Sequence, residues 1–472
     1  MLSIFRIKIT IKIIIIFLLL IFSNTNDSSA KVSINTTKNK NTKNHKQKII
    51  KKSNSKKSNK NSKNINKIAK PSNQKSNIIY NNEQFNSAID RSFNIEENKE
   101  KYNERNLAII KQSQYYLLTD YDTGEVIISN NHNEKLPPSS MTKVMTALIV
   151  FDLLKKQKIS LNNQCLIGVD AWKKRGSSMF LNYGDIVSVE DLLKGLLVAS
   201  GNDAAIALAE SLGSGYDNFV VMMNKKAQEI GLSNSQFKNP HGLNEEGHYM
   251  TLQDLSTLMI YIYRNHPEYS HYLGLEDFTF RNITQRNRNP LIKYGYEGVL
   301  GGKTGHTDAG GYGVVGAVKR ADRILIGVVN RANNPDNRSQ LIAALFDYGF
   351  NNYKKITLFK KNQFIGNVNV WLGRKKSVHA LIDKDISITV PINTNISDIK
   401  ITMKYLDPVF ANIKKGDKIA DLLITINNYK DFTYPLFAAE DVEKVYYARR
   451  IIQLVGYKLK KFIRNYKIDI AF

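Results

Sequence analysis

Three short motifs far apart in the chain constrain this sequence most, because they complete one chemical site only if the fold brings them together. Ser140-Met141-Thr142-Lys143 comes first, Ser200-Gly201-Asn202 follows, and Lys303-Thr304-Gly305 comes last. A serine hydroxyl becomes a good nucleophile only when a base activates it, and lysine can be that base. Side chains at i and i+3 share one face of a helix, so the Lys143 amine can reach the Ser140 hydroxyl. The three motifs together predict an acyl-transfer enzyme.

The Ser-x-x-Lys spacing carries little weight by itself in a lysine-rich chain. It recurs at Ser28/Lys31, Ser53/Lys56, Ser72/Lys75, Ser235/Lys238 and Ser397/Lys400. A capping serine followed by a surface lysine is the ordinary explanation of such a pair. Ser140 differs because Pro137-Pro138-Ser139 ends the preceding segment, and an apolar run predicted to be helical from about Ser140 to Lys155 follows. For Lys143 to act as a base its amine must be neutral, so burial or a cation such as Lys303 must lower its pKa.

The third motif has a rival interpretation as a phosphate-binding loop. Gly302-Lys303-Thr304 resembles the end of such a loop, which requires a glycine five positions before Gly302, but Glu297 stands there. The ATPase interpretation therefore fails. A glycine after the threonine instead suits a strand edge that a substrate backbone approaches closely.

The hydrophobic pattern predicts two folded domains. In residues 107–354, strands at both ends flank a series of helices, which predicts an α+β domain with an antiparallel sheet closed by its first and last strands and covered by helices. The strands are expected at Tyr115–Thr119, Glu125–Ser129, Tyr312–Val318 and Arg323–Val329, and the helices at Val187–Ala199, Ala204–Leu212, Asp217–Ile230, Leu252–Arg264 and Ser339–Tyr348. In residues 355–440, short strand-like runs predict a small all-β domain. These runs are Asn367–Leu372, Ile386–Val390, Ile399–Leu406 and Ile419–Ile426.

Residues 1–30 have the pattern of a secretory signal peptide. Three basic residues precede an apolar run, Ile13 to Phe22, that is shorter than the roughly 20 residues needed to span a bilayer, and Ser28-Ser29-Ala30 is a small-residue cleavage site. An uncleaved N-terminal anchor is the alternative. Either interpretation places the body of the protein outside the cytoplasm.

Residues 31–106 are predicted to form a lysine-rich disordered linker, with order beginning near Leu107. Residues 31–76 contain 15 lysines and no acidic residue, so they carry +15 of the formal charge of +26 and leave +11 for the rest of the chain. So few apolar residues cannot offset the entropy lost on ordering. No aromatic residue interrupts the tract to stack on bases, which argues against nucleic-acid binding. A tether attracted to an anionic cell-envelope surface fits better.

Residues 441–472 are predicted to contain an amphipathic helix from Val442 to Lys467. Its apolar face comprises Val445, Ala448, Ile451, Ile452, Val455, Leu459, Phe462, Ile463 and Tyr466, and its basic face Arg449, Arg450, Lys460, Lys461, Arg464 and Lys467. This pattern indicates a helix that lies in a bilayer interface as an anchor. A terminal helix packed on the β domain is the alternative.

Cysteine and histidine usage indicates no metal or other cofactor. Cys165 is the only cysteine, so no intrachain disulfide can form, and it is interpreted as a buried apolar residue. The eight histidines have no metal-binding spacing.

The three motifs are the signature of penicillin-binding serine peptidases and β-lactamases, and the chain resembles the D-alanyl-D-alanine carboxypeptidases among the low-molecular-weight penicillin-binding proteins. The matching segments are 138–146, 175–181, 200–204 and 303–307, and the resemblance runs from about Leu107 to Phe350 and more loosely to Leu436. It implies a β-lactamase/transpeptidase-like fold for the first domain. The middle motif reads Ser-Gly-Asn rather than the Ser-Asp-Asn of β-lactamases, and no Glu-x-x-Leu-Asn segment for a deacylating glutamate is present.

The resemblance implies a serine carboxypeptidase of the periplasm, peripheral on the outer face of the cytoplasmic membrane. It would remove the terminal D-alanine from peptidoglycan pentapeptides and be acylated by β-lactams. Ser140 would be the nucleophile and Lys143 its base. Ser200 would relay a proton to the leaving amine, and Asn202 would orient Lys143 and a substrate carbonyl.

The resemblance also implies a set of substrate-binding residues. Backbone N–H groups of Ser140 and His306 would hold the oxyanion, and Lys303, Thr304 and Gly305 would lie along the substrate. Arg338, and less directly Arg288, would bind its terminal carboxylate. His241 and His248 are interpreted as structural. A β-lactamase and a non-catalytic peptidoglycan-binding module are the alternatives, and endopeptidase activity on cross-links is a close variant.

Overall fold

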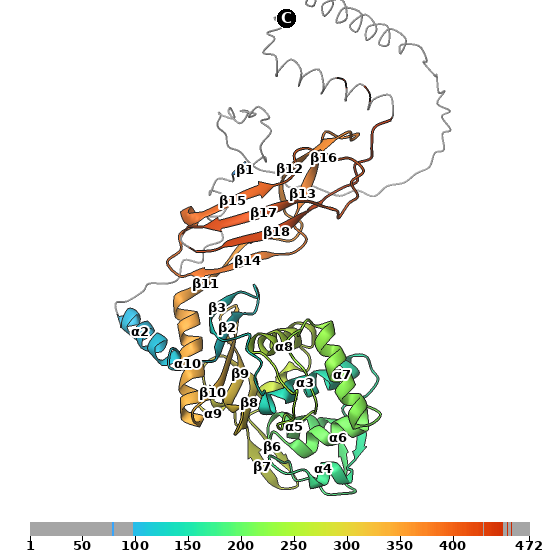
Figure 1. Cartoon of the computed structure of the whole chain (residues 1–472), viewed down its shortest axis with the longest axis vertical. Helices are drawn as coiled ribbons and strands as arrows, with labels where there is room; N and C mark the ends of the chain where they lie inside the picture. The colour runs from blue at the N-terminus through green and yellow to red at the C-terminus, as the bar shows by residue number, and fades with distance from the viewer. Residues whose placement is uncertain (1–77, 80–97, 428, 447–450, 452–454, 456–472) are drawn as a thin grey trace, which may run out of the picture. The chain divides into compact units, whose positions relative to one another are not determined.

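The computed structural model of the chain describes residues 78–79, 98–427, 429–446, 451 and 455. The predicted signal peptide, most of the predicted linker and most of the predicted C-terminal helix lie outside these residues. Two regular regions follow one another, an α+β domain and a β domain (Figure 1). Within the described ranges, no helix is both long and apolar enough to cross a bilayer.

The α+β domain is built on a five-stranded antiparallel sheet with strand order β3-β2-β10-β9-β8. The strands are β2 (Tyr116–Asp120), β3 (Val126–Asn130), β8 (Val299–Thr307), β9 (Gly311–Arg320) and β10 (Arg323–Ala332). The first strand, β2, pairs with the last, β10, as the sequence predicted; Thr119 lies opposite Ile326. Because β8 is at the edge, the Lys303-Thr304-Gly305 motif lies on a strand with one open side.

Helices cover both faces of this sheet. They are α2 (Asn98–Ile110), α3 (Lys143–Lys155), α4 (Val169–Lys173), α5 (Val189–Leu197), α6 (Asn202–Leu212), α7 (Tyr216–Glu229), α8 (Leu252–Asn265), α9 (Pro290–Lys293) and α10 (Pro335–Asn352). Successive strand side chains point to opposite faces. Tyr116 and Leu118 of β2 therefore pack in a cluster with Leu345 of α10, whereas Leu117 between them joins a larger cluster with α3 and its neighbours.

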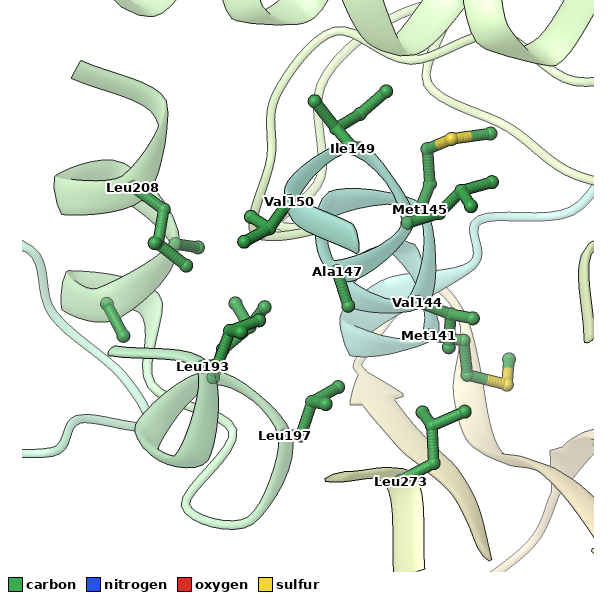
Figure 2. Close-up of a cluster of buried hydrophobic side chains, with 14 of the residues drawn as sticks. Met141, Val144, Met145, Ala147, Ile149, Val150, Leu193, Leu197, Leu208 and Leu273 are labelled. Carbon is green, nitrogen blue, oxygen red and sulfur yellow. The ribbon is translucent and has the colours of Figure 1, made fainter. Parts of the chain in front are cut away.

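Helix α3 is the centre of the larger core. Every residue from Lys143 to Asp152 is buried, which is the pattern of a helix enclosed by other elements rather than lying on the surface. Figure 2 shows Ala147 and Val150 of α3 on the side of Leu193 of α5 and Leu208 of α6. The nucleophile motif therefore lies at the start of the most enclosed helix.

Two local predictions for this domain were wrong. Helix α2 begins at Asn98, so order starts before Leu107 and the linker is shorter than predicted. This mostly polar helix packs on α10, where the Tyr102 hydroxyl donates a hydrogen bond to Asp347 Oδ2 at 2.8 Å. The predicted helix from Val187 begins at Val189 instead, because residues 186–188 form the short strand β5. Ser188 then caps α5, since its hydroxyl accepts from the Asp191 amide at 3.0 Å.

The short elements of this domain among the described residues form two two-stranded antiparallel sheets and two 3-10 turns. They are β4 (Gln164–Leu166) with β5 (Ile186–Ser188), β6 (Asp277–Phe280) with β7 (Ile283–Arg286), η2 (Ser139–Thr142) and η3 (Ser270–Gly274). Cys165 is buried in β4, and its thiol pKa is raised by that burial, as expected for a packing residue.

The β domain contains a seven-stranded sheet, order β1-β15-β17-β18-β13-β12-β16, and the two-stranded sheet β11-β14. Its strands are β1 (Ile78–Ile79), β11 (Tyr353–Phe359), β12 (Phe364–Trp371), β13 (Ser377–Leu381), β14 (Ile386–Pro391), β15 (Ile399–Lys404), β16 (Val409–Phe410), β17 (Lys418–Ile426) and β18 (Asp431–Ala438). The predicted strands correspond to β12, β14, β15 and β17. The sequence did not predict β1, β11, β13, β16 and β18.

The predicted start of the C-terminal helix was wrong. Val442 forms a bridge with Ile413 and Lys444 forms one with Gly373, so residues 442–446 are extended. Val442 and Val445 are buried in the β domain rather than lying on a helix face. Ile451 and Val455 are helical, and the other residues of the predicted helix lie outside the described ones.

Candidate active site

The nucleophile lies in a tight turn that precedes α3. Residues Ser139–Thr142 form the 3-10 turn η2, and α3 begins at Lys143 rather than at the predicted Ser140. Ser139 has a φ of 50°, a left-handed conformation that directs the chain into this turn. Side chains at i and i+3 nearly eclipse one another in a 3-10 turn. Accordingly, Lys143 Nζ lies 3.0 Å from Ser140 Oγ.

The Lys143 side chain is fully buried and its amine has three polar neighbours. Besides Ser140, these are Asn202 Oδ1 at 2.8 Å and the carbonyl oxygen of His241 at 2.6 Å. Burial holds the pKa of Lys143 well below its usual range, and the positive charge of Lys303 lowers it further, while Asp203 opposes the shift. A neutral amine donates two hydrogen bonds to the carbonyl oxygens and offers its lone pair to the Ser140 hydroxyl. This is the arrangement of a general base.

The second motif joins α5 to α6 through a strained residue. Ser200 has a φ of 61°, which is uncommon for a residue with a side chain, and α6 begins at Asn202. The Ser200 hydroxyl accepts a hydrogen bond from Lys303 Nζ at 2.9 Å. Burial, followed by the charges of Arg288 and Arg338, lowers the pKa of Lys303 to about 7. The second and third motifs are thus brought together as predicted.

Gly305 of the third motif has a packing role in addition to the expected one along the substrate. A Cβ at this position would lie 2.9 Å from the Pro138 carbonyl oxygen and 3.1 Å from Ser139 Cβ. Glycine therefore allows β8 to pack directly against the nucleophile turn η2. Gly242, with a φ of +85°, faces the same turn, because its Cβ would lie 1.8 Å from the Ser139 carbonyl oxygen.

A cavity of about 300 Å³ opens above these groups. Its lining residues are Ser140, Ser177, Ser200, Arg288, Thr304, Gly305, His306, Tyr312, Pro335 and Arg338, none of which carries a carboxylate. A larger cavity of about 620 Å³ adjoins it at Arg288, Pro335 and Arg338 but is not lined by Ser140 or by Ser200. The smaller cavity is therefore the one in which a bound molecule can meet the nucleophile.

Two arginines form a cationic wall of the catalytic cavity. Arg338 lies in the first turn of α10, which starts where Asn334 caps the helix by accepting from the Asn337 amide at 2.8 Å. Arg338 is only 9% exposed, and within the described residues its Nε has no hydrogen-bond partner. Arg288 Nη1 donates to Ser177 Oγ at 2.7 Å. Among the described residues, neither the buried Arg338 guanidinium nor the exposed Arg288 guanidinium is paired with a carboxylate, so this wall is suited to an anionic ligand.

The site also contains groups to which the sequence assigned no role. Asp203 is buried and accepts hydrogen bonds from the Met179 and Leu181 amides at 3.0 and 3.2 Å, which fixes the segment beside the cavity. Asn202 Nδ2 donates to the Arg175 carbonyl at 2.9 Å in the same segment. The segment was visible in the sequence only as part of the family resemblance. The sequence could not indicate that the His241 backbone carbonyl contacts Lys143, because every residue has a backbone carbonyl.

The two buried imidazole rings beside the site, His241 and His248, are neutral near pH 7. Burial lowers the pKa of His241 to about 2 and that of His248 to about 4. His248 Nε2 lies 2.9 Å from Thr142 Oγ1 and thereby supports the nucleophile turn. In the described part of the chain, no imidazole forms a hydrogen bond with Ser140, which agrees with the structural roles predicted for these two histidines. His306 lines the cavity and stacks on Tyr312, with ring centroids 3.9 Å apart.

Two family models match this chain. Residues 101–334 match the D-alanyl-D-alanine carboxypeptidase model, and residues 353–444 match the C-terminal domain of penicillin-binding protein 5. Among curated proteins, the carboxypeptidase DacF of Bacillus subtilis is 34% identical over 72% of this chain and 88% of its own length. DacC of Escherichia coli is 34% identical over 74% of this chain and 89% of its own length.

A solved structure shows the same fold. Penicillin-binding protein 5 from Haemophilus influenzae superposes with a TM-score of 0.67 at 34% identity, covering 70% of this chain and 98% of that protein. The likeness includes both the α+β domain and the β domain. The resemblance inferred from the three motifs is therefore confirmed.

Proposed function

Because this chain belongs to the D-alanyl-D-alanine carboxypeptidase family of serine peptidases, we propose that it removes the terminal D-alanine from peptidoglycan stem peptides through an acyl-enzyme on Ser140. One observation carries the proposal: a buried lysine amine with a lowered pKa lies 3.0 Å from the serine hydroxyl. The resulting nucleophile faces a cationic cavity suited to a peptide with a free C-terminal carboxylate.

The reaction proceeds in two half-reactions. Ser140 Oγ attacks the penultimate D-alanine carbonyl while its proton passes to Lys143 Nζ, and backbone N–H groups of Ser140 and His306 stabilise the oxyanion. When the C–N bond breaks, the proton taken up by Lys143 passes through Ser200 to the leaving amine, so D-alanine departs and the Lys143 amine is neutral again. Water then attacks the ester with Lys143 again as base, which releases the shortened peptide and restores the serine. Asn202 holds the Lys143 amine toward Ser140 throughout.

The anionic end of the substrate is held by the cationic wall and the third motif. Lys303 and Thr304 lie on the edge strand, and Arg338 faces the same cavity. A carboxylate there satisfies the Arg338 donor that has no partner within the described residues. Arg288 lines the catalytic and the adjoining cavity, as Arg338 does, and adds positive charge beside the carboxylate.

Replacing Arg338 with alanine should lower kcat/KM for a D-Ala-D-Ala peptide by about 100-fold, because charge-assisted bonds to a carboxylate contribute about 1.5–3 kcal/mol. Acylation by a neutral thioester, which has no carboxylate to bind, should fall less than threefold. Both rates are measurable by D-alanine release and by intact mass. Arg331→Ala, an exposed arginine on β10, is the matched control and should change neither. Equal losses on both substrates would show that Arg338 acts through structure.

The β-lactamase alternative requires rapid hydrolysis of the penicilloyl ester. Among the described residues that line the catalytic cavity, none carries a carboxylate that could activate a deacylating water. The proposal is tested by intact mass after incubation with a penicillin, in parallel with D-alanine release from a pentapeptide. A long-lived adduct together with D-alanine release supports a carboxypeptidase, and rapid turnover of the penicillin without D-alanine release contradicts it.

We also propose that the protein acts in the periplasm as a peripheral protein of the outer face of the cytoplasmic membrane. The signal-like residues 1–30 and the amphipathic pattern of the C-terminal residues support this location. Ile451 and Val455 are helical, one turn apart and exposed, as expected for an apolar face available to lipid.

Truncation after Tyr446 should weaken binding to anionic vesicles at least tenfold without affecting D-alanine release from a soluble peptide. The cut must not fall after Glu440, because Val442 and Val445 are buried in the β domain. Vesicle sedimentation at moderate salt measures the change. Undiminished binding would show that another segment, such as the lysine tract, is the anchor.

A further inference from the structure

We propose that Leu406, Phe410 and Tyr446 form an apolar tip of the β domain that inserts into the surface of an anionic bilayer. This inference goes beyond the catalytic function and rests on the proposed membrane location. Leu406, Tyr446 and Phe410 are 80%, 75% and 73% exposed, which makes them the most exposed large apolar side chains of the described part of the chain. Isolated exposed apolar residues need no explanation, but a cluster of the most exposed ones does.

Backbone pairing brings three separate segments together at this tip. Phe410 of β16 lies beside Trp371 at the end of β12, and the Ala411 amide donates to the Trp371 carbonyl at 2.8 Å. Figure 1 shows β16 alongside β12 in the β domain. The Val445 amide donates to the carbonyl of Leu372, the residue after Trp371, at 3.0 Å.

A side-chain contact fixes Tyr446 in the same place. The Tyr446 hydroxyl accepts from Arg374 Nη2 at 2.7 Å, and the guanidinium lies 4.9 Å from the centre of the ring. The aromatic ring is thus held at the tip although it is 75% exposed. An aromatic ring with a hydrogen-bonded hydroxyl suits a bilayer interface, where one end is apolar and the other is wet.

The charge around the tip matches an anionic surface. The three segments 371–376, 404–415 and 440–446 contain seven lysines and arginines and four acidic residues, a net charge of +3. All four carboxylates have a partner: Lys375 binds Glu440, Lys414 binds Asp441, Arg374 binds Glu443, and Asn369 donates to Asp407. Cations such as Lys404 and Lys415 near exposed apolar side chains are the combination that attracts a protein to anionic lipid.

The position of the tip along the chain points to lipid rather than to a soluble partner. Tyr446 is the last residue of the β domain described in an unbroken stretch, and the sequence after it contains seven lysines and arginines and a single acidic residue among apolar ones. Because the tip directly precedes this basic segment, the tip and the segment contact the same bilayer surface. Two linked contacts hold a protein far more tightly than either contact alone.

The test compares two exposed phenylalanines on β12 and its partner strand. Phe410 lies beside the last residue of β12, whereas Phe364 is its first residue and is 52% exposed. In the full-length protein, with buried Cys165 replaced by alanine, F410C and F364C are labelled with an environment-sensitive dye. Vesicles of phosphatidylglycerol and phosphatidylethanolamine should shift the dye at 410 to the blue and leave the dye at 364 unchanged. Phosphatidylcholine vesicles should produce little shift at either position.

A second measurement uses matched substitutions. F410S should weaken partitioning into the anionic vesicles by about tenfold, whereas F364S should not change it. Both variants should release D-alanine from a soluble peptide at the wild-type rate. This assay measures catalysis independently of vesicle binding. If the protein binds vesicles while the dye at 410 stays in water, the tip proposal is wrong and the membrane location stands. A shift that rises with protein concentration without vesicles would assign the tip to a second copy of the chain and overturn the proposal.

Discussion

Replacing Ser140 with alanine is expected to abolish both the penicillin adduct and D-alanine release. Removal of a serine nucleophile from a comparable catalytic unit lowers kcat by roughly 10⁶-fold, and a fall of at least about 10⁴-fold is expected here. The fold should survive, because the Ser140 hydroxyl bonds only to Lys143 among the described residues and lies at the cavity. Losing a helix-start hydroxyl costs at most about 0.5–2 kcal/mol.

The neighbouring serine is a matched control for this substitution. Ser139→Ala makes the same chemical change one residue earlier, where the hydroxyl is buried and bonds to Thr307 Oγ1 at 2.9 Å. This variant should still form the adduct, with a rate loss of about tenfold or less from a loosened turn. Thermal unfolding of both variants separates chemistry from folding. D-alanine release at the wild-type rate by the Ser140 variant would disprove the nucleophile assignment and leave a binding module as the better description.

The sequence predicted those parts of the site that depend on short-range geometry. Ser140 and Lys143 are three residues apart at a helix start, so their proximity follows from local structure. Lys303 was placed correctly at a strand edge because a glycine follows Thr304, which suits such an edge. The family resemblance supplied the long-range meeting of Ser200 with Lys303, which no local pattern can give.

The sequence could not predict features that arise only when distant segments pack. Helix α2 is mostly polar, and it is ordered by contact with α10. In the sequence, Val442 and Val445 fit the apolar face of a helix as well as they fit an extended segment. In the structure they are extended and buried in the β domain. Gly305 was assigned to substrate approach and does line the cavity, but the sequence did not show that its missing side chain also makes room for the nucleophile turn. In each case a tertiary contact supplies what the local pattern does not show.

The second large effect is expected at Lys143. Lys143→Ala should lower kcat/KM by at least about 10³-fold, because general-base catalysis contributes about 10²–10⁴-fold and no other base contacts Ser140 among the described residues. Asn202→Ala is the matched control, because it removes a contact of the Lys143 amine without removing the amine itself. It removes one acceptor, Oδ1 at 2.8 Å, but leaves the base in place, so a loss of only about 10–100-fold is expected.

Because the pKa of Lys143 is held well below its usual value, the sign of the pH dependence follows directly. The reactive form has a neutral amine, so kcat/KM of the wild type should rise with pH through the lowered pKa of Lys143. It should fall again at higher pH, because Lys303, whose pKa is about 7, then loses the charge that helps to hold the substrate carboxylate. Protonation at acid pH removes the lone pair that accepts the Ser140 proton.

Chemical rescue separates the base role of Lys143 from a structural one. A small primary amine added to Lys143→Ala can enter the space left by the buried side chain and should restore acylation by penicillin at least tenfold. The rescued rate should follow the concentration of the unprotonated amine as pH is varied, since only that form accepts a proton. Rescue by the ammonium form, or a wild-type rate that falls as pH rises through the acid range, would show that Lys143 acts as a fixed cation. A fixed cation would leave the Ser140 proton without an acceptor, and the two-step mechanism would then require another base.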